Sequence, residues 1–213
     1  MKKQYAVFGM GSFGESVAVA LQDLGCEVIA VDNDMEKIED IADSVSYAMR
    51  ADFGEPEVIR SLGARNLDGV IVAVAENMEA SVMATLVSKE MGVPYVMSKA
   101  KNELHATVLR KIGADAVIFP ENEMGKRIAK TLASANFTDW LALSPDYSII
   151  EVPTPGKWVG KSLIELDVRK HYGINVVAVK QGEHVEVSVD PAMSLEADMV
   201  LVLVGANEAL EKL

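Results

Sequence analysis

Three glycines near the start of the chain have the spacing of a phosphate-binding loop. Gly9, Gly11 and Gly14 follow the apolar run of residues 5–8 in the pattern GxGxxG, which is typical of a strand, a tight turn and the start of a helix. The first glycine of such a loop permits the turn, the second lets a pyrophosphate approach the backbone, and the third lets the helix pack closely on the strand. The N–H groups at the start of the helix would then bind phosphate.

An acidic residue follows at the place where this motif needs a ribose acceptor. Residues 27–31 read as a second strand that ends at Asp32, about 18 residues after Gly14. The alternative is a glycine turn without a ligand, in which Asp32 and Asp34 only cap the next helix. Asp32 would repel a 2′-phosphate, and its neighbours Asn33 and Asp34 supply no cation, so the sequence disfavours a 2′-phosphorylated dinucleotide.

The elements that must position this loop alternate between strands and helices. Beyond the first strand-helix-strand unit, short apolar runs predict four further strands, and the segments between them predict helices at residues 35–42, 55–62, 78–91 and 103–112. This alternation predicts an α/β fold, a Rossmann-type doubly wound parallel sheet with a nucleotide crevice at the carboxyl ends of its strands. The segments at that edge are residues 9–14, Asp32, Asp52, residues 74–77 and Lys99.

A long amphipathic helix is predicted after the last of these strands. Pro120 opens it, and residues 121–135 carry an apolar stripe of Met124, Ile128, Ala129 and Leu132. No seventh strand of this sheet follows, and residues 136–145 are predicted as a crossover that contains Phe137, Trp140 and Leu141. Because the helix has no sheet to cover, we expect a homodimer built through this segment.

The pattern changes near residue 148 and predicts a second, smaller α+β domain. Strands are expected at residues 149–152, 174–179, 185–189 and 199–204, with one short helix at residues 163–172. The predicted organisation is therefore a nucleotide-binding domain of residues 1–135, a linker of residues 136–147 and a C-terminal domain of residues 148–213.

Charge and composition exclude several classes of partner. The chain has 20 Lys and Arg against 32 Asp and Glu, a net charge of -12, which opposes binding to nucleic acid or to an anionic bilayer. Its apolar runs are far shorter than the roughly 20 residues of a membrane-spanning helix, and its first residues lack a signal-peptide core. We therefore expect a cytoplasmic protein without direct bilayer insertion.

Two functional classes fit a dinucleotide-binding fold. An NAD-dependent oxidoreductase needs an acid or base beside the hydride acceptor. The second domain offers only His171 and His184, both expected at the surface, and His105 lies on a helix of the first domain. No metal-ligand spacing or nucleophile motif is present. A non-catalytic nucleotide-binding switch is favoured, with the oxidoreductase as the alternative.

Further segments carry a family resemblance over nearly the whole chain. They are Val74-Ala75-Glu76-Asn77, Ser98-Lys99-Ala100, residues 112–115, 120–121, 126–128 and 167–169, and residues 172–178. With these the chain resembles the RCK family, the cytosolic regulatory subunits of Ktr and Trk potassium transporters, with a TrkA-N nucleotide-binding domain and a TrkA-C domain. The resemblance implies homodimers assembled into a ring of eight on the cytoplasmic face of a membrane potassium-transporter subunit. It also implies opening by ATP and closing by ADP, with NAD(H) bound by some relatives.

The resemblance also assigns individual residues to a nucleotide site. The implied contacts are phosphate for Gly11 and Ser12, ribose for Asp32 and Asn33, adenine for Asp52 and Phe53, the crevice lining for Ala75 and Glu76, and the phosphate end for Lys99 and His105. Glu121 would share a cation with the nucleotide across a subunit contact, and Gly9, Phe13, Gly14 and Val74 complete the implied cofactor-binding residues. Each of several residues could instead have a purely structural role. Asp52 would form a turn, Phe53 would pack in the core, Lys99 and His105 would be exposed to solvent, and Glu121 would interact with the helix dipole.

One position departs from the family pattern. Gating members commonly have Arg where this chain has Ser12, and a hydroxyl cannot bind a terminal phosphate bidentately as a guanidinium does. AMP, ADP or NAD(H) thereby become more plausible ligands beside ATP. In the second domain, the positions that match a cyclic di-AMP site of some relatives are Ile164, Asp167, Arg169, Asn175 and Pro191.

Overall fold

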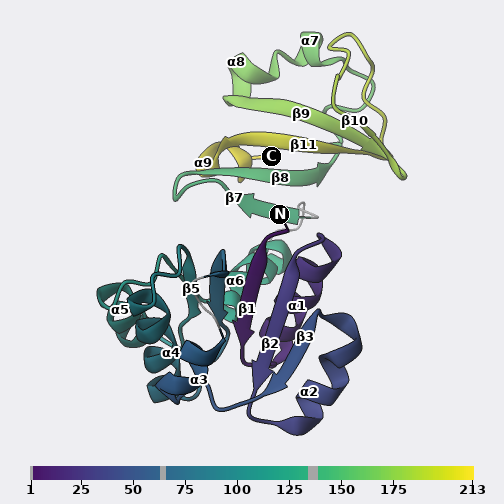
Figure 1. Ribbon diagram of the computed structural model, residues 1–213. Coiled ribbons are helices and arrows are strands. Elements are labelled where there is room, and N and C mark those ends of the chain that lie inside the picture. Colours follow the sequence, from purple (N-terminus) through teal and green to yellow (C-terminus); the bar gives the residue numbers. More distant parts are fainter. Residues whose placement is uncertain (1, 63–65, 134–138) are drawn as a thin grey trace. The chain divides into compact units, whose positions relative to one another are not determined.

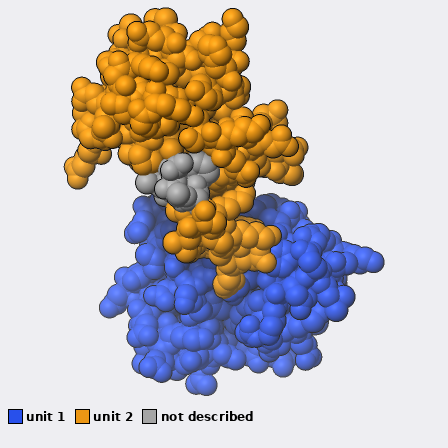
Figure 2. Space-filling view, turned by 180° about the vertical axis from the view of Figure 1, so that it is seen from behind, with its two compact units in different colours: residues 1–120 blue, residues 121–213 orange. Residues whose placement is uncertain are grey.

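The chain folds into two compact units, residues 1–120 and residues 121–213 (Figures 1 and 2). The structure is a computed structural model, and it describes residues 2–62, 66–133 and 139–213. The division at residue 120 does not test the domain boundary predicted at residue 135 or the linker predicted at residues 136–147, so both stay predictions.

The first unit is built on a six-stranded parallel sheet with the order β3-β2-β1-β4-β5-β6. Its strands are β1 (Gln4–Phe8), β2 (Glu27–Asp32), β3 (Tyr47–Arg50), β4 (Gly69–Val72), β5 (Val96–Lys99) and β6 (Ala116–Ile118). The order reverses between β1 and β4, which is the topological switch point where such folds bind ligands. The predicted Rossmann-type fold is confirmed.

Helices cover both faces of this sheet (Figure 1). They are α1 (Ser12–Asp23), α2 (Met35–Ile41) with the 3₁₀ turn η1 (Ala42–Ser44), α3 (Pro56–Ser61), α4 (Met78–Glu90) and α5 (Glu103–Lys111). Successive side chains of β1 point to opposite faces, so Val7 packs in the cluster with α1 and α2 while Phe8 packs in the cluster with α3 and α4. The buried apolar runs of β1 and β4 follow from this two-sided cover.

The second unit contains α6 (Pro120–Ala133), which begins at the boundary, and a five-stranded antiparallel sheet with the order β10-β9-β11-β8-β7. The strands are β7 (Asp139–Ala142), β8 (Tyr147–Pro153), β9 (Ile174–Gln181), β10 (His184–Glu186) and β11 (Met199–Ala206). The short helices α7 (Leu163–Leu166), α8 (Val168–Tyr172) and α9 (Asn207–Leu210) complete the unit, whose core surrounds the fully buried Trp158. The predicted α+β character is confirmed.

The structure corrects three details of this second unit. Trp140 and Leu141 belong to strand β7, which forms a hairpin with β8, rather than to an irregular crossover. The predicted helix of residues 163–172 is interrupted at Asp167, whose left-handed φ of 41° separates α7 from α8. The predicted strand of residues 185–189 is limited to β10, which pairs with β9 only over residues 184–186. The expected roles of Asn136 and Phe137 lie outside the described residues.

Candidate functional site

The glycine loop lies between β1 and α1, at the carboxyl edge of the parallel sheet. Gly9 has a φ of +93°, and a Cβ there would overlap the side chain of Val74. A Cβ on Gly14 would overlap the carbonyl oxygen of Gly9, so both positions require glycine for the fold itself. At Gly11 an added Cβ would meet no described atom within 4 Å. The fold therefore leaves open space over Gly11, as the approach of a phosphate to the backbone requires.

The start of α1 differs from the starts of α2, α4 and α5. Those three helices are capped by the side chains of Asp34, Asn77 and Asn102. The N-cap of α1 is Gly11, which has no side chain to accept a hydrogen bond from the first turn. The positive end of the α1 dipole thus faces the open space over Gly11, which is the arrangement of a phosphate-binding helix.

Asp32, the last residue of β2, is fastened to this loop. It is 4% exposed, and its Oδ2 accepts a hydrogen bond of 2.6 Å from the backbone N–H of Met10. Its Oδ1 accepts a bond of 2.9 Å from the N–H of Asp34. A carboxylate offers about four lone-pair sites, so two would remain for the hydroxyls of a ribose.

Two cations that the sequence reasoning missed lie beside Asp32 and Asn33. The Nζ of Lys37 is 3.7 Å from Asp32 Oδ2, and Arg50 Nε donates a bond of 3.1 Å to the carbonyl of Asn33. Asn33 and Asp34 supply no cation themselves, but the fold places these two cations near Asp32 and Asn33. The parallel register pairs Asp32 with Arg50 across β2 and β3, and that pairing cannot be read from local sequence.

The residues predicted for adenine lie just beyond β3. Asp52 Oδ1 accepts a bond of 2.9 Å from the N–H of Gly54, which closes a turn. Phe53 is 6% exposed, and its ring stacks on Phe8 with a centroid distance of 5.7 Å. The Phe53 ring is thus a core side chain, and its contact with adenine stays a prediction.

The loops after β4 and β5 lie at the same carboxyl edge of the sheet, on the other side of the glycine loop from Asp32. Val74 and Ala75 are largely covered, whereas the Glu76 side chain is 84% exposed and forms an ion pair with Lys101. From the end of β5, Lys99 Nζ lies 5.9 Å from the centroid of the Phe13 ring in the first turn of α1. The sheet therefore brings Lys99 close to the glycine loop, as expected of a cation at the phosphate end.

His105 is buried, so the alternative of a solvent-exposed helical position is wrong, and its predicted contact at the phosphate end stays a prediction. It is 2% exposed, and its Nδ1 accepts a bond of 3.3 Å from the N–H of Lys101. This bond assigns the ring proton to Nε2, which has no hydrogen-bond partner among the described residues. Burial lowers the pKa of His105 from its ordinary value of 6.5. The imidazole is a neutral group that holds the loop after β5.

The predicted residues in the second unit form two bonded pairs around α7 and α8. The N–H of Ile164 donates a bond of 3.0 Å to the carbonyl of Pro191, and Asp167 follows at the left-handed junction. Arg169 Nε donates a bond of 2.7 Å to Asn175 Oδ1, so Arg169 is held by Asn175 in this structure. Glu121 lies in the first turn of α6, and its cation-binding role stays a prediction.

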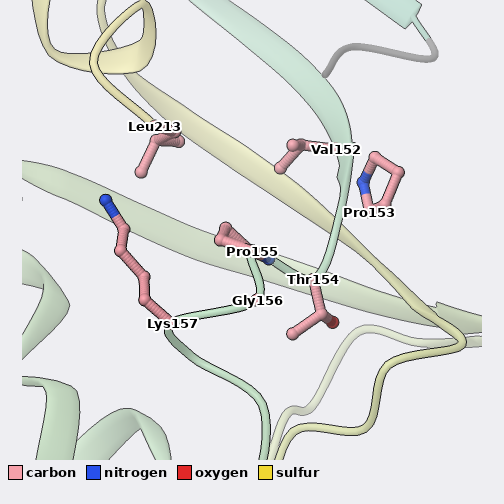
Figure 3. A pocket seen from close by; sticks show the side chains of 7 residues that line it. All are labelled: Val152, Pro153, Thr154, Pro155, Gly156, Lys157 and Leu213. Atoms are coloured by element: carbon pink, nitrogen blue, oxygen red, sulfur yellow. The ribbon is translucent and has the colours of Figure 1, made fainter. Parts of the chain in front are cut away.

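A cavity of about 320 Å³ lies elsewhere in the second unit, at the end of β8 (Figure 3). Pro153, Pro155 and Lys157 line it together with Leu213, and the Lys157 side chain extends toward Leu213. None of the residues predicted for a nucleotide or a cyclic dinucleotide is part of its lining.

Neither a metal cluster nor a membrane-spanning helix is found in the described part of the chain. Within residues 2–62, 66–133 and 139–213, no group of three or more His, Cys, Asp or Glu side chains could hold a metal ion. No helix in these ranges is both long enough and apolar enough to cross a bilayer.

Comparison with known families and proteins gives matches along the whole chain. Residues 5–120 match the TrkA-N domain and residues 147–213 match the TrkA-C domain. The Ktr system potassium uptake protein C of Bacillus subtilis is 42% identical over 97% of this chain and 93% of its own length. The Ktr system potassium uptake protein A of the same organism is 39% identical over 99% and 95%.

Solved structures share the fold at low sequence identity. The GsuK channel superposes with a TM-score of 0.70 at 16% identity, over 99% of this chain and 38% of the channel chain. The GsuK channel bound to NAD gives a TM-score of 0.68 with the same identity and coverage.

Proposed function

Since the chain belongs to the family that combines a TrkA-N with a TrkA-C domain, as its relatives among the Ktr potassium uptake proteins also show, we propose that it is a non-catalytic regulatory subunit of a membrane potassium transporter. Its ligand is an adenine nucleotide, bound at the carboxyl edge of the parallel sheet. The protein acts at the cytoplasmic face of the membrane through its transporter partner.

The observation that carries the proposal is the geometry around Gly11. The α1 start has no side-chain cap, the space over Gly11 is open, and Asp32 is bonded to the same loop. Lys99 approaches from β5. Together these features provide backbone donors and a cation for phosphates and a carboxylate for ribose.

The family relatives favour a regulator over the oxidoreductase alternative. Hydride transfer requires a group that exchanges a proton with the substrate. His105 is the imidazole of the crevice edge, and its burial and its bond to the Lys101 N–H suit a structural role. ATP, ADP, AMP and NAD(H) all remain candidate ligands, because Ser12 is exposed and provides only a hydroxyl at the start of α1.

Assembly through α6 is part of the same proposal. Met124 and Ile128 are each 51% exposed, Leu132 is 81% exposed, and no residue from 120 to 133 is buried. An apolar stripe of this kind is a surface for association, and a second copy of the chain provides the matching stripe of a twofold contact. The dimers would assemble further into an octameric ring.

The residues that lie together around α7 support a second ligand, cyclic di-AMP. Ile164 is 63% exposed beside Pro191, and Arg169 is oriented by Asn175. These residues offer an apolar wall and a cation for a phosphate. Titration of the full chain with cyclic di-AMP should give saturable binding that Arg169→Ala weakens. An unchanged affinity in Arg169→Ala would remove this assignment.

The nucleotide site is tested most directly by Gly11→Ala. Because φ is not positive there and no described atom lies near the added Cβ, the fold should tolerate alanine. A phosphate bound close to the Gly11 backbone would collide with the added methyl group. Calorimetry should therefore show nucleotide affinity at least about tenfold weaker, which corresponds to the loss of one hydrogen bond to a charged group. Gly156→Ala, at an equally open position, is the control.

Mass spectrometry of nucleotide that co-purifies with the protein identifies the ligand. An unchanged affinity in Gly11→Ala, or a reduction of NAD that depends on an added substrate, would contradict the proposed function.

A further inference from the structure

Two exposed charges meet at the edge of the nucleotide crevice. Glu76, in the loop between β4 and α4, forms an ion pair with Lys101, in the loop between β5 and α5. Their side chains are 84% and 53% exposed, and an ion pair in such a position contributes little to stability. A stronger anion could therefore displace Glu76 from Lys101 at small cost.

The backbone of Lys101 is held in place by a buried group, whereas its side chain is held, among the described residues, only by the exposed ion pair with Glu76. The Lys101 N–H donates to Nδ1 of the buried His105, and the Asn102 side chain caps α5 by accepting a bond of 2.9 Å from the His105 N–H. The ammonium group, by contrast, sits at the end of a flexible four-carbon chain. The ammonium group can therefore change position while the backbone that carries it stays in place.

The position of this cation fits the far end of a nucleotide phosphate chain. In the sheet, β1 has β2 on one side and β4 and then β5 on the other. A nucleotide with its ribose at Asp32, after β2, and its first phosphates at the glycine loop, after β1, extends toward the loops after β4 and β5. Lys99 of the same loop already reaches within 5.9 Å of the Phe13 ring.

A cation favours binding there because a triphosphate is strongly anionic and the chain as a whole carries the same sign of charge. The chain has a net charge of -12, and a triphosphate adds several negative charges. Ser12, at the start of α1, has no charge with which to bind a terminal phosphate.

On the basis of the proposed function, we infer that Lys101 exchanges Glu76 for the terminal phosphate of a nucleoside triphosphate. Glu76 then competes with that phosphate for Lys101, and the pair determines how strongly triphosphate is preferred over monophosphate. The discrimination that an arginine at position 12 would provide is supplied here from the loop after β5.

Calorimetric titration of the full chain with ATP, ADP and AMP, in the presence of a chelator, tests this inference. Lys101→Gln should weaken ATP binding about five- to twentyfold, as expected for one lost charge-assisted bond, and leave AMP affinity within about twofold. Glu76→Gln should tighten ATP binding, because it removes the competitor for Lys101, and an unchanged ATP affinity would argue against the exchange. The matched controls are Glu103→Gln and Arg110→Gln, an ion pair on α5 with side chains 82% and 52% exposed, which should not alter the ratio of ATP to AMP affinity.

Equal weakening of all three nucleotides in Lys101→Gln, no weakening of ATP, or unchanged or weaker ATP binding in Glu76→Gln would overturn the inference. These outcomes differ from failure of the proposed function, in which the wild-type protein binds none of the three nucleotides.

Discussion

The carboxylate of Asp32 accepts a 2.6 Å hydrogen bond from the backbone N–H of Met10, so the end of β2 and the glycine loop form one bonded unit. A residue that was expected to bind a ribose also holds the loop that was expected to bind phosphate. The two parts of the proposed nucleotide site therefore depend on the same side chain.

Asp32→Ala should weaken adenine-nucleotide binding by roughly 1.5 to 3 kcal/mol, the range for hydrogen bonds to a charged group, because ribose acceptors and the Met10 bond are lost together. Calorimetry on the variant and the wild type measures this difference. Asp34→Asn is the control, since asparagine still caps α2 and Asp34 is exposed. Equal affinity in Asp32→Ala and wild type would contradict the prediction.

His105→Gln should flatten the dependence of thermal stability on pH. Burial lowers the pKa of His105 below 6.5, so the folded state favours the neutral ring. The folded state therefore loses stability as pH falls through 6.5, the ordinary value, toward the lower pKa of the folded state. Glutamine can still accept the Lys101 N–H and does not titrate.

Melting temperatures of both proteins across this range provide the measurement. His184→Gln, at an exposed position in β10, should keep the wild-type profile. If His105→Gln lost stability on acidification as steeply as the wild type, another group would be responsible.

Asp115→Asn should lower the free energy of unfolding by about 1 kcal/mol at neutral pH and by less in acid. Burial raises the pKa of Asp115, but bonds from Lys89 and from the Val96 N–H outweigh it, and the net pKa lies below the ordinary value of 3.8. The carboxylate therefore stabilises the fold above its unfolded pKa, and this contribution is lost as pH falls through the lower, folded pKa. Urea unfolding at pH 7 and near pH 3 should show that the free energies of unfolding of the wild type and the variant converge in acid. A difference that is the same at both pH values would argue against a contribution from the ionised pair.

Leu132→Glu should shift the protein toward monomer. Leu132 is 81% exposed on the apolar stripe of α6, and a buried, unpaired carboxylate at a dimer contact would be costly. Leu24→Glu is a matched control in the first unit, since Leu24 is 80% exposed. Sedimentation velocity at micromolar concentration with nucleotide should separate the two variants, and a monomeric wild type would refute assembly through α6.

The order of strands and helices in the first unit follows from local sequence. Short apolar runs separated by helical segments allow only a parallel, two-sided sheet, and Gly9 and Gly14 mark the turn because no side chain fits at either position. The predicted α+β character of the second unit likewise followed from alternating residues and turn signals. In both units, the type and order of these elements follow from patterns of residues that lie close together in the chain.

Tertiary structure decided which charged groups meet. Arg50 reaches Asn33 because β3 pairs with β2, Lys101 reaches Glu76 because β5 lies beside β4, and His105 becomes buried because α5 packs against the sheet. The break at Asp167 and the hairpin of β7 with β8 are visible only in the structure. The sequence determined the periodicity that makes each element, whereas contacts between residues far apart in the chain depend on strand register and burial, which only the assembled sheet specifies.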